Sequence, residues 1–61
     1  MMIFEGVKLK CKMTGTIFEV KRVEDKFVVL ESEEGVDQEW IDMGWLPFFF
    51  EAAGNNETVW Q

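Results

Sequence analysis

The side chains that could carry chemistry in this 61-residue chain are carboxylates, a short lysine series and one thiol. The chain has 12 Asp and Glu residues, six Lys and Arg residues, one cysteine and no histidine. Without histidine there is no imidazole base, no Ser-His or Cys-His catalytic pair and no Cys/His zinc site. The five glycines stand singly, so there is no glycine-rich phosphate loop. These absences predict a protein that is not an enzyme and holds no metal or cofactor.

Charge is distributed unevenly along the chain. Residues 1–26 carry six basic and four acidic groups, whereas residues 27–61 carry eight acidic groups and no basic one. An acidic surface keeps a small protein soluble, and it can also recruit a basic partner. A further interpretation is that the spaced carboxylates imitate nucleic-acid phosphates. The acidic patch is centred on Glu31, Glu33, Glu34, Asp37 and Glu39.

Three lysines alternate with apolar residues near the N-terminus. Lys8, Lys10 and Lys12 share one face of a period-two pattern, and Cys11 falls on the other face, where we expect a small buried hydrophobe. A row of cations can neutralise phosphates, so a nucleic-acid-associated barrel is an alternative function. The overall net charge of −6 opposes such binding, and we do not expect nucleic acid to be the partner.

The densest aromatic stretch, residues 39–50, holds two of the three tryptophans, three of the six phenylalanines and the only proline. Three consecutive phenylalanines in a strand would alternate sides, which would leave at least one of them outside the core. Exposed aromatic groups mark interfaces, either with a protein or peptide or between copies of the chain. The candidate partner-binding residues are Trp40, Trp45, Pro47 and Phe49, beside Glu33, Glu34 and Asp37 of the acidic loop.

The spacing of apolar residues predicts five short strands and no long helix. We expect strands at residues 7–13, 16–23, 27–32, 38–41 and 48–52. Apolar side chains on both faces of residues 27–32 indicate a central strand. A single helical turn is expected between Gly44 and Pro47, because proline favours helix starts and disfavours helix at the residue before it. The pattern predicts an all-β barrel over residues 1–53 and a partly ordered tail over residues 54–61.

The stretch from Gly44 to Phe50 resembles the closing segment of SH3 domains. In that family a glycine, two apolar residues, a proline, two variable residues and an aromatic residue form a helical turn before the last strand, and Gly44, Pro47 and Phe50 fall on those positions. The chain has no tyrosine and no adjacent tryptophan pair, so only Pro47 and Phe50 match the peptide-binding groove of the family. Residues 12–20 also look like the strand-glycine-strand unit of KOW-type SH3-like barrels, which often bind RNA or ribosomal and polymerase surfaces.

These observations predict a small five-stranded SH3-like barrel that acts as a non-catalytic interaction module for a protein or peptide. The alternatives are the nucleic-acid-associated barrel and a homo-oligomer whose aromatic face is the subunit interface. The longest apolar run, residues 45–50, is far shorter than the roughly 20 residues of a membrane span. Because the single cysteine is unpaired and no signal-peptide pattern begins the chain, we expect a cytoplasmic protein with no membrane association.

Overall fold

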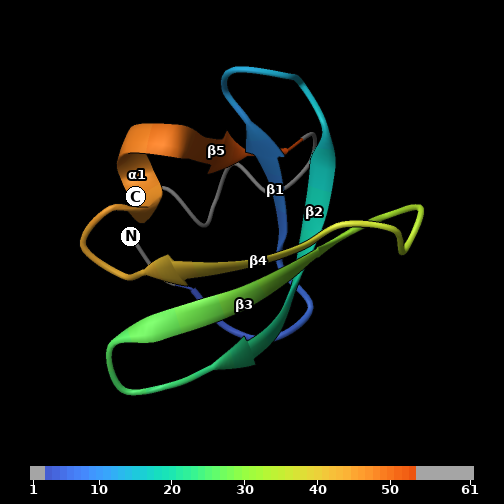
Figure 1. Ribbon diagram of the computed structural model, residues 1–61. Coiled ribbons are helices and arrows are strands. Elements are labelled where there is room, and N and C mark those ends of the chain that lie inside the picture. The colour runs from blue at the N-terminus through green and yellow to red at the C-terminus, as the bar shows by residue number, and fades with distance from the viewer. Residues whose placement is uncertain (1–2, 54–61) are drawn as a thin grey trace.

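Residues 3–53, which the computed structural model describes, form one five-stranded antiparallel sheet that curls into a half-barrel (Figure 1). In chain order the elements are β1 (Lys8–Cys11), β2 (Ile17–Val23), β3 (Phe27–Ser32), β4 (Gln38–Asp42), α1 (Leu46–Phe49) and β5 (Phe50–Ala52). The strand order is β4-β3-β2-β1-β5, so β4 and β5 are the two edges. The all-β class and the helical turn before the last strand are confirmed. The expected tail at residues 54–61 lies outside the described residues.

The first strand is shorter than the expected span of residues 7–13. The chain turns after Cys11, whose carbonyl accepts a hydrogen bond from the Gly15 N–H at 2.8 Å. Gly15 has φ +79°, a left-handed conformation that glycine adopts without steric cost. Met13 is therefore 80% exposed instead of continuing the apolar face of the strand. The period-two alternation of the sequence continues to Met13, although the strand itself ends at Cys11.

The core fills the concave side of the curled sheet. It consists of alternate residues of β1, β2 and β3, the residue before β1, one residue of α1 and one of β5, namely Val7, Leu9, Phe18, Val20, Val28, Leu30, Leu46 and Phe50. Phe18 and Phe50 meet edge to face with their ring centres 5.4 Å apart, a favourable geometry for two aromatic rings. Leu9 pairs with Ala52, so the first strand of the chain, β1, lies beside the last strand, β5.

The third strand is central, as expected, because it pairs with β2 on one side and β4 on the other. Val28 and Leu30 face the core. Val29 is also buried, although it faces the convex side with Phe27, where the Phe27 ring stacks on Trp40 at 5.3 Å between ring centres. The convex side of the sheet thus carries a small aromatic patch of its own.

The expected fifth strand is present, but it covers only residues 50–52 of the expected span 48–52, so the expected alternation of three phenylalanines along a strand was wrong. Pro47 stands in the first turn of α1, where its fixed φ and missing N–H suit a helix, and the helix extends through Phe49. Phe48 and Phe49 consequently project from a helical turn and are 67% and 39% exposed. Only Phe50 enters the strand, and it points into the core.

Candidate partner-binding hollow

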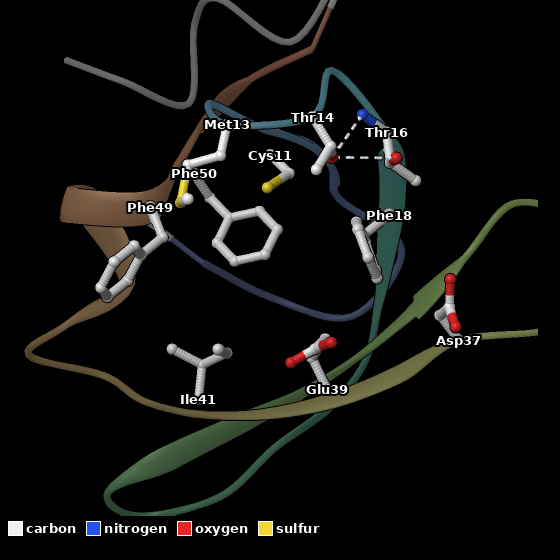
Figure 2. Close-up of a pocket in the computed structure, with 10 residues that line it drawn as sticks. All are labelled: Cys11, Met13, Thr14, Thr16, Phe18, Asp37, Glu39, Ile41, Phe49 and Phe50. Atoms are coloured by element: carbon white, nitrogen blue, oxygen red, sulfur yellow. Dashed lines mark hydrogen bonds between the residues drawn. The ribbon is translucent and has the colours of Figure 1, made fainter.

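A hollow of about 400 Å³ lies between β4 and the turn that follows β1. Figure 2 shows Ile41 and Glu39 projecting from β4 toward Cys11, Phe18 and Phe50 on the opposite wall. Six apolar or sulfur-bearing side chains line it: Cys11, Met13, Phe18, Ile41, Phe49 and Phe50. Four polar residues complete the lining: Thr14, Thr16, Asp37 and Glu39. The hollow is therefore an apolar cup with carboxylates at one side.

The register of β3 and β4 decides which β4 side chains enter the hollow. Ile41 lies opposite Val28 and Glu39 lies opposite Leu30. Directly opposed residues of an antiparallel pair project to the same face, and both β3 partners belong to the core. Ile41 and Glu39 are therefore turned to the concave side, whereas Trp40 is turned to the convex side.

Within the part of the chain that the structure describes, no cation lies beside the two carboxylates of the hollow. Within residues 3–53, neither Asp37 nor Glu39 forms an ion pair. The backbone of Asp37 is held in place by buried Ser32, whose N–H donates to the Asp37 carbonyl at 2.9 Å and whose Oγ accepts from the Asp37 N–H at 3.2 Å. These bonds hold the Asp37 backbone, and the Asp37 and Glu39 carboxylates lie beside an apolar surface, an arrangement complementary to a group that is both cationic and apolar.

Aromatic residues of α1 and the residue before it extend the wall of the hollow onto the surface. We call Trp45, Phe48 and Phe49 the α1 aromatic cluster. The Trp45 ring centre lies 5.7 Å from that of Phe48 and 6.2 Å from that of Phe49, and Phe49 lines the hollow itself. Pro47, from the same turn, is exposed, and its carbonyl accepts a hydrogen bond from Lys12 Nζ at 2.8 Å. Trp45 is thus in ring contact with Phe49 beside the hollow, and Pro47 belongs to the same turn.

The other candidate residues lie elsewhere. Trp40 stacks on Phe27 on the convex side of the sheet. It therefore lies on the face of β4 that points away from the hollow. Glu33 and Glu34 line a separate depression of about 250 Å³ beside Gly15 and Ile17. The acidic loop is therefore divided, with Asp37 on the hollow and the two glutamates on the depression.

The lysines are engaged by acceptors on neighbouring segments. Lys8 Nζ lies 3.0 Å from Glu33 and 3.7 Å from Glu19, and Lys10 Nζ lies 3.6 Å from Glu51. The hydrogen bond with Glu33 raises the pKa of Lys8, and the charges of both carboxylates act in the same direction. A phosphate group approaching these lysines would have to compete with the carboxylates already beside them.

Cys11 is not the fully buried hydrophobe that the alternation predicted. It is half-buried at the end of β1 and forms part of the hollow. The hydrogen bond with the Thr14 side chain lowers the pKa of its thiol, while burial and the negative charge of Glu39 oppose that effect. Sequence reasoning considered Phe18 only as a residue that could stack a nucleic-acid base, and it did not assign Ile41 to a site, although the alternation of residues 38–41 places Ile41 and Glu39 on one face.

Residues 3–53 contain no group of three or more His, Cys, Asp or Glu side chains arranged to hold a metal ion. No helix in this part of the chain is long and apolar enough to cross a membrane. Comparisons of the chain with protein-family models, with curated proteins and with solved structures gave no match.

Proposed function

We propose that this chain is a non-catalytic interaction module that binds a segment of a protein or peptide at the hollow. The observation that carries this proposal is an apolar hollow with exposed aromatic residues at its rim and two carboxylates that form no ion pair within the described residues. Aromatic anchors and desolvated pockets supply most of the energy at protein interfaces. A partner with one apolar anchor and an adjacent basic residue fits this combination.

The strand order and the short helix before β5 support an SH3-like barrel as the architecture of the module. The stretch that resembles SH3 domains, from Gly44 to Phe50, contains α1 and the first residue of β5. In the proposed module, Pro47 and Phe49 stand at the rim of the hollow, and Phe50 forms part of its wall.

Selection from a random peptide library, followed by titration of the selected peptides, tests the proposal. We expect binding that weakens by about tenfold when Phe49→Ala removes one wall of the hollow, the loss typical of an interface anchor. Val23→Ala removes an exposed apolar side chain that does not line the hollow, and it should leave the affinity unchanged. A library that yields no binder, or binders equally sensitive to both variants, contradicts the proposal.

Self-association is the second candidate, favoured by the exposure of Trp45 (58%) and Phe48 (67%). In that case the α1 aromatic cluster packs against the same cluster of a second copy. Sedimentation equilibrium over a range of protein concentrations distinguishes the two functions. The binding module predicts a monomer, whereas the homo-oligomer predicts a dimer that Phe48→Glu dissociates.

A further inference from the structure

Within residues 3–53, the β4 strand pairs with another strand on one side only. It pairs with β3 through the register Phe27–Asp42, Val28–Ile41, Val29–Trp40, Leu30–Glu39 and Glu31–Gln38, and it is an edge of the sheet. This register has no bulge, and β4 contains no proline or lysine, which are common means of blocking an edge. Its outer backbone groups are therefore not obstructed by the strand itself.

Two hydrogen bonds at the ends of this register show which backbone groups point outward. The Ser32 N–H donates to the Asp37 carbonyl at 2.9 Å, and the Met43 N–H donates to the Lys26 carbonyl at 2.8 Å. Because residues of an antiparallel strand alternate between bonded and non-bonded positions, Glu39 and Ile41 also bond to β3. The N–H and carbonyl groups of Gln38 and Trp40 then point away from β3.

The next outward residue, Asp42, is partly occupied, because its carbonyl accepts a hydrogen bond from the Trp45 N–H at 2.9 Å. Gln38 and Trp40 thus present a two-residue set of donors and acceptors to an incoming chain. The same stretch of β4 supplies Glu39 and Ile41 to the hollow. An open strand edge and an apolar cup with carboxylates coincide here.

We infer that β4 accepts an added antiparallel strand from a basic partner, and that alternate side chains of this strand fill the hollow. The inference rests on the proposed function and specifies its mode of binding. The residue opposite Ile41 is apolar and enters the cup. The residues opposite Glu39 and Asp37 are basic, because directly opposed charges of opposite sign stabilise a strand pair. The residues between them bond to the backbone of Gln38 and Trp40.

Charge selects a basic partner over a second copy of this chain. Asp37, Glu39 and Asp42 lie on or beside β4, and residues 37–43 include no basic side chain. Pairing two β4 edges would bring carboxylates of both copies together without a cation between them, and such like-charge contacts are destabilising. The acidic edge therefore opposes self-pairing while it attracts a cationic strand.

The probe for this inference is the acetylated and amidated peptide Thr-Val-Thr-Lys-Thr-Lys-Thr. In the antiparallel register its valine lies opposite Ile41, and its lysines lie opposite Glu39 and Asp37. Amide hydrogen exchange measured by NMR should show new protection at Gln38 and Trp40 when the peptide is added. Glu39 and Ile41 should change little, because their N–H groups already bond to β3. A peptide with glutamate in place of both lysines should bind about tenfold more weakly.

Backbone methylation separates strand addition from side-chain contact. N-methylation of the third and fifth residues removes the two N–H groups directed at Trp40 and Gln38, and it should abolish binding. N-methylation of the two lysines alters N–H groups that point away from β4, and it should leave most of the affinity. Equal effects of the two modifications would overturn the inference.

A matched pair of protein variants tests the same edge from the other side. Gln38→Pro removes one outward N–H at the first residue of the strand, where proline is tolerated and no bond to β3 is lost. It should weaken peptide binding about fivefold, the equivalent of one net hydrogen bond. Gln38→Ala keeps the N–H and should bind normally. The methylated peptides make the test independent of whether the proline variant folds.

The outcomes distinguish this inference from the proposed function. Binding of the peptide without protection of Gln38 and Trp40 would overturn strand addition and leave the interaction module standing. Absence of binding by this peptide would also overturn strand addition, whereas the interaction module itself fails only if the library selection yields no binder sensitive to Phe49→Ala.

Discussion

The convex face of β1 and β2 and the edge at β4 carry similar residue types in opposite arrangements. On the convex face Lys8 lies opposite Glu19, which lies opposite Glu31 on the next strand. Lys21 reaches both glutamates, at 3.6 Å and 3.7 Å, so like charges on adjacent strands share a cation. At the β4 edge, Glu39 stands beside an apolar wall and has no cation within the described residues.

The difference shows that strand register, rather than composition, decides whether a carboxylate lies beside a lysine, as Glu19 and Glu31 do, or beside the hollow, as Glu39 does. Exposed ion pairs contribute little to folding free energy and are screened by salt, but they occupy the charges that form them. The lysines and glutamates named on the convex face are therefore already paired with one another. At the β4 edge no cation pairs with Glu39 within the described residues, and under the proposed function the partner supplies that cation.

The largest expected effect comes from removing the part of the hollow that belongs to the core. Phe50→Ala deletes a buried ring that packs against Phe18, and it should lower the free energy of unfolding by about 3–5 kcal/mol. Phe48→Ala, on the exposed side of α1, should change it by less than about 0.5 kcal/mol. Urea denaturation followed by circular dichroism measures both. Similar losses would mean that the α1 aromatic cluster is part of the core.

Charge reversal at the β4 edge should come next. Glu39→Lys places a cation beside the hollow and should weaken binding of the lysine peptide about tenfold or more. Glu34→Lys makes the same change in net charge at the separate depression and should have a much smaller effect. Isothermal titration calorimetry at matched salt compares the two variants. Equal losses would indicate a response to net charge alone and would remove the distinction between the two regions.

The paired lysines of the convex face should not retain nucleic acid. We expect no salt-dependent binding of labelled single-stranded RNA at near-physiological salt, because carboxylates already accompany Lys8 and Lys10. Fluorescence anisotropy is the measurement. Binding that weakens with added salt and with Lys10→Glu would favour the nucleic-acid-associated barrel.

The smallest effect concerns the thiol in the hollow. Because the hydrogen bond from Thr14 lowers the pKa of Cys11, its thiolate should form at a lower pH in the folded protein than in the urea-unfolded chain. The rate of alkylation by iodoacetamide, measured against pH, gives the midpoint in each state. Glu39→Gln should shift the folded midpoint further down, since the charge of Glu39 opposes ionisation of the thiol. A folded midpoint at or above the unfolded one would contradict the expectation.

The sequence predicted the elements whose periodicity has a single interpretation. The span of β3 agrees with its prediction, and β2 begins one residue later than expected, because β-branched residues bounded by polar turns specify a strand clearly. The end of β1 was missed because Met13 continues the alternation although Gly15 turns the chain. The start of β5 was predicted too early. Consecutive phenylalanines are compatible with a strand, but Pro47 stands in the first turn of a helix that continues through Phe49.

Of the residues at or beside the hollow, the sequence pointed to some and not to others, because the local pattern does not show which face a residue takes. Aromatic content pointed to Trp45 and Phe49, and the structure brings both to one rim. It could not separate Trp40 from them, because the face on which a β4 residue lies depends on its register with β3. The wall formed by Cys11 and Phe18 lies far along the sequence from Glu39 and Ile41, which face it from β4, so no local sequence pattern predicts the hollow.

The pairing of β1 with β5 has a consequence for the order in which this chain folds. The four strands from β1 to β4 pair with their neighbours in the sequence, whereas β5 pairs with β1, the strand that is farthest from it in the sequence. During synthesis the meander emerges first, without Leu46 and Phe50 to complete its interior. Closing so long a loop is entropically costly and slows folding. We therefore expect the domain to fold cooperatively only after its last strand has been synthesised.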